Sequence, residues 1–193
     1  MTFEEIKSKL KLFTVGIAGA GGLGPNCAIA LARVGIGKII ISDFDIVDET
    51  NLNRQYFFRN QLGIKKVIAL KENILKIDPT IEILTNDLKL DQTNFPEIYK
   101  ECDVIVEAFD LAEMKQMLIE TCITNFPDKP IVLGLGMAGY GKNNLIKFRQ
   151  SENLYICGDE QSEIGINNPP LAPRVGMVAN MQANTVLEIL LNK

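Results

Sequence analysis

The sequence contains no histidine, and this absence limits the chemistry that the chain can perform. Without imidazole there is no Ser-His-Asp triad, no histidine general base and no metal site that depends on histidine ligands. The four cysteines form no Cys-x-x-Cys pair, so we expect neither a structural zinc nor a disulfide framework. Chemistry must therefore depend on carboxylates, lysine, arginine, backbone amides and at most one thiol.

The chain also lacks a strong charge of either sign and any long apolar segment. Its net charge is −4 over 193 residues, which gives no overall basic field to attract nucleic acid or an anionic membrane. Residues 1–11 are too charged for a signal peptide or a membrane span. Apolar residues make up 47%, which is ordinary for a soluble protein. We therefore expect one cytoplasmic domain of α/β class.

One stretch, residues 15–43, has the order of a mononucleotide-binding βαβ unit. An apolar run, a glycine loop, an alanine-rich helical pattern and a second apolar run follow one another. The loop fits Gly-x-Gly-x-x-Gly, in which the first glycine permits a tight turn, the second admits phosphate and the third allows close helix packing. These glycines are Gly19, Gly21 and Gly24. Asp43 follows nineteen residues later, where an acid can accept a hydrogen bond from a ribose hydroxyl. This motif alone does not separate NAD from ATP.

A polar block after the second apolar run favours ATP. Asn51 and Arg54 are three residues apart on an expected helical turn, with Gln55 beside them, so they can share a face. Lys66 stands three residues after Gly63, on the first turn of the next expected helix. A triphosphate brings about four negative charges and a pyrophosphate leaving group, which such cations stabilise. We interpret the other lysines of that helix as solvated: Lys65, Lys71 and Lys76.

Asp110 follows another apolar strand and precedes a helical pattern. An acid in this place is either the N-cap of the helix or a magnesium ligand that bridges to phosphate oxygens. We predict the magnesium ligand. Glu107 lies within the strand itself, so we expect it to be buried or to face an edge.

The remaining periodicity predicts a Rossmann-like, mostly parallel sheet flanked by helices, with a short antiparallel extension near the C-terminus. Strands are expected at 14–18, 38–42, 80–85, 104–108 and 130–135, with short antiparallel strands at 145–148 and 155–156. Helices are expected at 2–11, 23–34, 63–77, 95–100, 111–125 and 174–191.

Taken together, these residues resemble the ThiF/MoeB family. The resemblance rests on GAGGLG, on SDFDIVDETNLNRQ, on Gly-x-x-Lys at 63–66 and on the acid after the fourth strand. It covers nearly the whole chain, and Asp-x-x-Asn-x-x-Arg-Gln at 48–55 is its most specific part. Members are ATP-dependent activators of ubiquitin-like sulfur carriers, related to the adenylation domains of ubiquitin-activating enzymes. Residues 1–193 are thus expected to be a single adenylation domain.

The resemblance implies ATP and Mg²⁺ as cofactors and assigns roles to individual residues. Asp43 would bind the ATP ribose, Gly21 would lie against the phosphates and Asp110 would organise magnesium. Catalysis would depend on Arg54, Lys66 and Asp110. The other implied nucleotide contacts are Gly19, Gly22, Gly24, Asp45, Asn51 and Gln55.

The implied reaction suits a chain without histidine. The C-terminal glycine carboxylate of the carrier attacks the α-phosphorus of ATP, giving an acyl-adenylate and pyrophosphate. A carboxylate with a pKa of about 3.5 is already ionised at neutral pH, so the step needs no general base. It needs charge neutralisation and in-line positioning.

The resemblance implies a homodimer and a ThiS-like carrier of thiamine thiazole biosynthesis. We expect the carrier body to be held by residues 137–144 and 160–173. Three alternatives stay open. The substrate could be a carrier of the molybdopterin-synthase type or a tRNA, or the chain could be a nucleotide-binding scaffold without catalysis. An NAD oxidoreductase has the least support, because no residue resembles a hydride-transfer acid.

The chain departs from the family at its cysteines and at its N-terminus. Typical members carry two zinc-binding Cys-x-x-Cys pairs, whereas only Cys157 stands in the corresponding region, so no zinc is expected. Cys157 is the thiol we expect to be exposed, either as a reactive group or as a small residue that ends a strand. Members also place an arginine in the N-terminal segment. No arginine precedes Arg33 here, and Lys9 or Lys11 is the candidate replacement.

Overall fold

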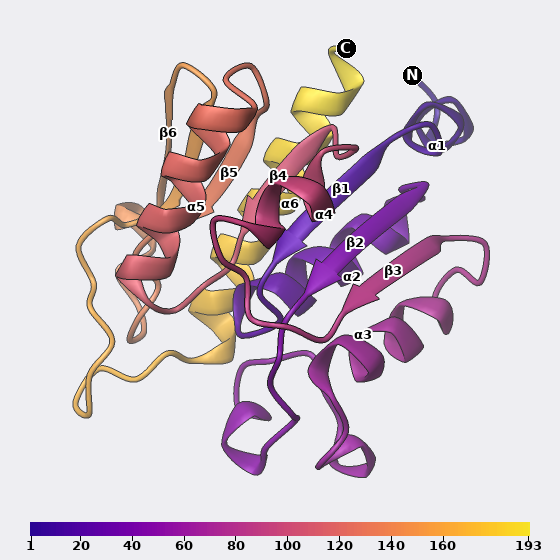
Figure 1. The fold of residues 1–193 in the computed structure, drawn as a ribbon. Coiled ribbons are helices and arrows are strands. Elements are labelled where there is room, and N and C mark those ends of the chain that lie inside the picture. Colours follow the sequence, from indigo (N-terminus) through magenta and orange to yellow (C-terminus); the bar gives the residue numbers. More distant parts are fainter.

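Seven strands form one sheet in the order β3-β2-β1-β4-β5-β7-β6. The computed structural model describes residues 1–193, and Figure 1 shows the sheet between its helices. Six strands run parallel, and β6 alone is antiparallel to its neighbour β7. This confirms the predicted Rossmann-like fold. The strands are β1 (Thr14–Ala18), β2 (Lys38–Ser42), β3 (Glu82–Asn86), β4 (Val104–Glu107), β5 (Ile131–Gly134), β6 (Lys147–Ser151) and β7 (Leu154–Gly158).

Helices cover both faces of the sheet (Figure 1). Helices α2, α3 and α6 pack on one face around the larger apolar core, and α4 and α5 pack on the other around a smaller one. Because both faces are covered, the central strands are apolar except at their ends. None of the helices is both long and apolar enough to cross a membrane. They are α1 (Phe3–Leu10), α2 (Leu23–Val34), α3 (Lys66–Leu75), α4 (Asn94–Tyr99), α5 (Ala112–Asn125) and α6 (Ala172–Leu191).

The chain order places a topological switch between β1 and β4. From β1 the chain moves outward to β2 and β3, and it then returns to the other side of β1 as β4. The carboxyl ends of the parallel strands meet at the lower edge in Figure 1, together with the segment that follows β2. In open α/β sheets ligands bind at this edge, beside the switch point.

Two predicted element starts are corrected by pairing between distant segments. Helix α3 begins at Lys66 rather than at Gly63, because Gly63 donates its N–H to Val47 O at 2.9 Å and Val47 donates to Ile64 O at 2.8 Å. Strand β3 begins at Glu82 rather than at residue 80. Both starts depend on contacts that local periodicity does not contain.

The predicted antiparallel extension is longer than expected and continues the main sheet. Strand β7 pairs in parallel with β5, from Ile131 opposite Leu154 to Gly134 opposite Cys157. Strand β6 then returns beside β7 as an exposed edge strand. Residues 154–158 are therefore covered by the same helix layer as the central strands, including α6.

Candidate nucleotide site

The glycine loop lies at the switch point, in contact with the loop that follows β4. Gly19 donates its N–H to Ser42 O at 2.9 Å, which ties the loop to the end of β2. Ala108 donates its N–H to Ala18 O at 2.9 Å, and a Cβ on Gly19 would lie 2.8 Å from Ala108 O. Only a residue without a side chain allows these two loops to approach so closely.

The three motif glycines have different surroundings. Gly19 has φ +104°, in the region that favours glycine. A Cβ on Gly24 would lie 2.0 Å from Gly19 O, so only glycine lets α2 begin against the loop. A Cβ on Gly21 would meet no atom within 4 Å. Gly21 therefore faces open space, where a phosphate can approach the backbone.

Asp43 joins the end of β2 to the glycine loop. Its Oδ2 accepts the Ala20 N–H at 2.7 Å, and its Oδ1 accepts the Asp45 N–H at 2.8 Å. Burial raises the pKa of the Asp43 carboxyl, although these two N–H groups and the Lys66 charge act in the opposite direction. Each carboxylate oxygen has two lone pairs, so the group can still accept a ribose hydroxyl.

Lys66 is a buried cation on the first turn of α3. It is 5% exposed, and its Nζ lies 2.7 Å from Asp45 Oδ2. Its backbone N–H also bonds to Asp45 O at 2.9 Å, so the polar block fixes the start of the helix. The neighbouring Lys65 is half-buried and pairs with Asp87 at 3.0 Å. The two adjacent lysines thus have different environments.

Arg54 lies against the glycine loop. Two of its side-chain carbons are 4.0 Å from the position of a Cβ on Gly22, and Asn26 Nδ2 bonds to both Gly22 O at 2.7 Å and Arg54 O at 3.0 Å. The guanidinium pairs with no carboxylate and bonds only to Thr50 O and Asn53 Oδ1. This leaves its charge available to an anion.

Asn51 and Gln55 flank Arg54 in different ways. Asn51 Oδ1 accepts the Asp48 N–H at 3.0 Å and so belongs to the capping box of the 3₁₀ turn Glu49–Asn51. Gln55 is 7% exposed, and its Oε1 has no hydrogen-bond partner in the chain. The Asn51 amide nitrogen and the Gln55 carboxamide keep bonding capacity toward a ligand.

Asp110 is exposed in the loop between β4 and α5. The N-cap of α5 is Leu111, with no side-chain cap, so the N-cap alternative for Asp110 is wrong. The structure brings together no group of three histidine, cysteine or acidic side chains that could hold a metal ion. A single carboxylate still fits magnesium, which is held by one or two carboxylates together with substrate phosphates and waters.

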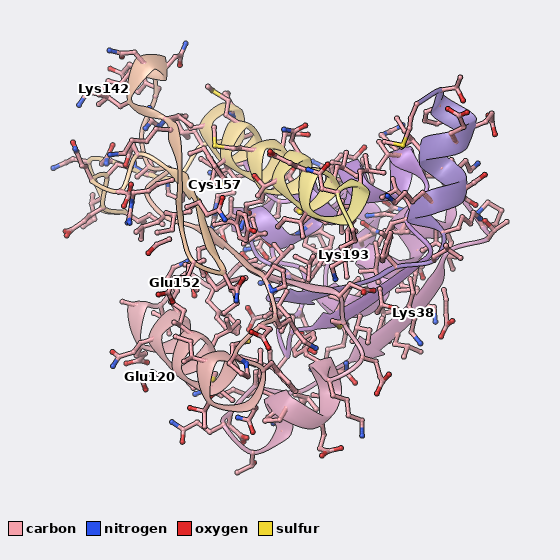
Figure 2. All side chains as sticks on the ribbon, turned by 90° about the horizontal axis from the view of Figure 1, so that it is seen from above. Lys38, Glu120, Lys142, Glu152, Cys157 and Lys193 are labelled. Atoms are coloured by element: carbon pink, nitrogen blue, oxygen red, sulfur yellow. The ribbon has the colours of Figure 1, made fainter.

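The expectation that Cys157 is exposed is wrong. Cys157 is completely buried, and its Sγ lies 3.7 Å from Thr185 Oγ1 of α6. Burial raises the pKa of this thiol to about 11. Figure 2 labels Cys157 on the ribbon beside α6. The other three cysteines are also buried: Cys27, Cys102 and Cys122.

Two buried ion pairs near the carboxyl ends of the parallel strands were not predicted from the sequence. Glu107 is completely buried, one of the two expected outcomes, but its partner Lys115 was not foreseen. Arg174 and Asp159 are each 3% exposed and bond to each other. The one sequence signal for these pairs is a basic residue on the apolar face of a helix: Lys115 on α5 and Arg174 on α6.

The two segments expected to hold the carrier body lie together. Ala138 forms a bridge with Pro170, and Gly139 donates its N–H to Pro169 O at 2.9 Å.

The candidate replacements for the N-terminal arginine lie elsewhere: Lys9 bonds to Leu191 O and Lys11 to Thr80, near the amino ends of the strands. Within this chain neither lysine reaches the glycine loop.

Comparison with known families matches residues 2–193 to the ThiF family. The chain belongs to the ThiF family. A probable molybdopterin-synthase adenylyltransferase of Porphyra purpurea is 36% identical over 194 residues, which cover 97% of this chain and 50% of that protein. The adenylyltransferase and sulfurtransferase MOCS3 of Aedes aegypti is 29% identical, over 95% of this chain and 43% of that protein. This ThiF-family chain spans about half the length of the curated relatives it matches.

Solved structures share the fold. The E. coli tRNA N6-threonylcarbamoyladenosine dehydratase TcdA, in complex with AMP, has a TM-score of 0.88 at 20% identity, covering 97% of this chain and 90% of that one. E. coli MccB with ATP has a TM-score of 0.74 at 27% identity, covering 96% of this chain and 57% of that one. The arrangement of the ThiF-family chain is thus found in proteins solved with adenine nucleotides.

Proposed function

We propose that this chain binds ATP and adenylates the C-terminal glycine carboxylate of a small ubiquitin-like sulfur carrier of the ThiS type. One observation carries the proposal: the glycine loop has two cations around it. Arg54 lies against Gly22 with no carboxylate partner, and the buried Lys66 is linked to the loop through Asp45 and Asp43. The Arg54 charge is unpaired, whereas the Lys66 charge is paired with Asp45 inside the chain. A triphosphate needs such cations more than a dinucleotide does.

In the proposed reaction the chain provides positioning and charge rather than proton transfer. The carrier carboxylate is ionised at neutral pH and attacks the α-phosphorus directly, so the absence of histidine is no obstacle. Asp43 orients the ribose, backbone amides near Gly21 face the phosphates, and Arg54 and Lys66 stabilise the departing pyrophosphate. Asp110 is the residue that would hold Mg²⁺, which neutralises phosphate charge when it is bound.

The names of the relatives support a nucleotidyl-transfer reaction. The 36% identical relative is named an adenylyltransferase, and MccB, at 27% identity, was solved with ATP. We further propose that residues 1–193 form one adenylation domain that acts as a cytoplasmic homodimer. The family match over residues 2–193 supports the single domain.

A carrier of the molybdopterin-synthase type is the second candidate substrate. It is favoured by the name of the 36% identical relative. Both candidates require the same chemistry at the glycine loop and differ in the surface that meets the carrier body. We assign that surface to residues 137–144 and 160–173, which pair through Gly139 and Pro169.

ATP–pyrophosphate exchange against a panel of purified substrates tests the function. The panel contains a ThiS-type carrier, a molybdopterin-synthase-type carrier, tRNA and a buffer control, and each carrier is also tested without its C-terminal glycine. We expect exchange with the intact ThiS-type carrier alone. Exchange with another substrate would transfer the assignment to it, and ATP binding without exchange would favour the scaffold.

A further inference from the structure

A buried ion pair lies directly behind the loop that carries Asp110. Glu107, the last residue of β4, is completely buried. Lys115 Nζ, from α5, lies 2.9 and 2.8 Å from the two oxygens of the Glu107 carboxylate. The same ammonium donates to Gly134 O at 3.0 Å. Its three hydrogen-bond donors are therefore all used inside the protein.

The carboxylate of Glu107 also binds the loop backbone. The Phe109 N–H donates to Glu107 Oε1 at 2.6 Å, one residue before Asp110. On the other side, Gln182 Nε2 of α6 donates to Glu107 O at 2.9 Å. Glu107 thus joins α5, α6 and the Asp110 loop at the carboxyl end of β4.

Stability alone is a weak reason for this pair. Replacing a buried ion pair by apolar side chains of similar volume is often neutral or stabilising. The surroundings are suited to such a replacement, because a cavity of about 400 Å³ beside the pair is lined by apolar groups that include Ile119, Leu133 and Leu135. Apolar side chains in place of the pair would not accept the Phe109 N–H, so they would not fix the loop backbone.

The loop in question already touches the glycine loop. The Ala108 N–H donates a hydrogen bond to Ala18 O, and the Ala108 carbonyl lies against Gly19. The direction of the following peptide decides where the exposed Asp110 carboxylate points. The bond from the Phe109 N–H to Glu107 sets that direction.

We propose that Glu107 and Lys115 are positioning residues that hold the Phe109–Asp110 backbone so that the Asp110 carboxylate faces magnesium and the nucleotide phosphates. The inference rests on the proposed function, because it assigns to Asp110 the magnesium role given there. It adds that the metal affinity of this site depends on a lysine that touches neither metal nor nucleotide. Partners that orient a metal ligand typically contribute 10- to 100-fold to metal affinity.

The test compares four variants of the chain. Lys115→Met keeps the side-chain length and removes the charge, whereas Lys115→Arg keeps the charge and has the adjoining cavity to accommodate its larger head. Lys100→Met is the matched control, because Lys100 forms an exposed pair with Glu97 away from the site. The double variant Glu107→Gln/Lys115→Met removes both charges and leaves no buried lone charge, so it replaces Lys115→Met if that chain does not fold.

The readout is ATP binding by calorimetry over a range of Mg²⁺ concentrations, with hydrogen exchange at the Phe109 amide. For Lys115→Met we expect ATP affinity without Mg²⁺ to stay within about twofold, the Mg²⁺ concentration for half-maximal effect to rise about 10- to 100-fold, and the Phe109 amide to exchange faster. Lys115→Arg and Lys100→Met should match the wild type. A purely structural role would lower ATP affinity equally with and without Mg²⁺.

The outcomes separate this inference from the proposed function. If the wild type binds no ATP, the proposed function fails and this inference fails with it. If the wild type binds ATP but Mg²⁺ has no effect, the metal role of Asp110 and this inference fail, while nucleotide binding stands. If Lys115→Met and the double variant keep the wild-type Mg²⁺ dependence, the positioning role alone is overturned.

Discussion

Ala20 donates its backbone N–H to Asp43 Oδ2 at 2.7 Å, which joins the glycine loop to the end of β2. The sequence motif assigns this acid to a ribose hydroxyl, and the structure adds a second task. The same carboxylate also accepts the Asp45 N–H, so it holds the loop and the polar block together. Asp43 therefore shapes the site in addition to its proposed contact with the ribose.

The two tasks of Asp43 can be separated with a modified nucleotide. We predict that the wild type binds ATP about 10- to 100-fold more tightly than 2′,3′-dideoxy-ATP, because a hydrogen bond to a charged group contributes about 1.5–3 kcal/mol. In Asp43→Ala this preference should disappear, and the free energy of unfolding should fall by about 1–3 kcal/mol because two N–H groups lose their acceptor. Calorimetry and urea denaturation measure these effects. An Asp43→Ala chain that still discriminates between the two nucleotides would show that another residue binds the ribose.

Substituting alanine for two glycines of the loop should affect different properties, ATP affinity at Gly21 and stability at Gly24. A Cβ at Gly21 meets no atom within 4 Å, so Gly21→Ala should unfold like the wild type yet bind ATP more weakly, because the methyl group occupies the phosphate approach. A Cβ at Gly24 would lie 2.0 Å from Gly19 O, so Gly24→Ala should lose more than about 1–3 kcal/mol of stability. Thermal denaturation and ATP titration test both variants. Unchanged ATP affinity in Gly21→Ala would show that the phosphates do not bind at Gly21.

Lys66 and Arg54 should control adenylation, whereas their neighbours should not. We expect Lys66→Ala and Arg54→Ala to lower pyrophosphate exchange about 10²–10³-fold each, as for the loss of one preorganised donor to the transition state. The matched controls are Lys65→Ala and Arg59→Ala, whose side chains pair with Asp87 and Glu49 at the surface. Near-normal exchange in the first two variants would contradict the assignment. A loss in the controls as large as in the test variants would show a general charge effect.

The sequence predicted the βαβ unit almost to the residue. Strands β1 and β2 and helix α2 have the expected bounds, because strong apolar runs and glycines fix them locally. The predicted nucleotide residues near Asp43 and Gly21 do meet at one edge of the sheet, since consecutive parallel strands end there.

Other features depended on contacts that no local pattern contains. The burial of Cys157 results from α6 packing over β7, through a residue 28 positions away. The bond between Lys115 and Glu107 requires α5 to fold back on the strand before it. Local periodicity therefore gave the elements, and the packed structure showed how the buried ionisable groups are paired.

All four cysteines should be unreactive in the native chain. Burial raises the pKa of Cys157 to about 11 and those of Cys102 and Cys122 to about 12, and it raises that of Cys27 further. A thiolate-specific reagent at pH 8 should therefore label no cysteine before unfolding and four afterwards. Cys157→Ala should retain pyrophosphate exchange within a few-fold. Rapid native labelling of one thiol that is lost in Cys157→Ala would restore this cysteine as a reactive group.

The buried pair of Asp159 and Arg174 should give a distinct dependence of stability on pH. Burial opposes ionisation of Asp159, but N–H groups of Ser162 and Gln161 and the charge of Arg174 together hold its pKa below the usual range. A lowered pKa stabilises the fold above the unfolded value near 3.8, and this contribution is lost as the pH falls through the lower folded value.

Asp159→Asn leaves Arg174 buried without a partner charge, so at pH 7 it should lower the free energy of unfolding by about 3–5 kcal/mol. The difference between Asp159→Asn and the wild type should narrow below about pH 4. Urea denaturation at pH 7 and pH 3 measures it, with Arg149→Ala, which removes an exposed pair with Glu160, as a control expected to change stability by less than about 1 kcal/mol. An equal difference at both pH values would mean that the charge of Asp159 contributes nothing.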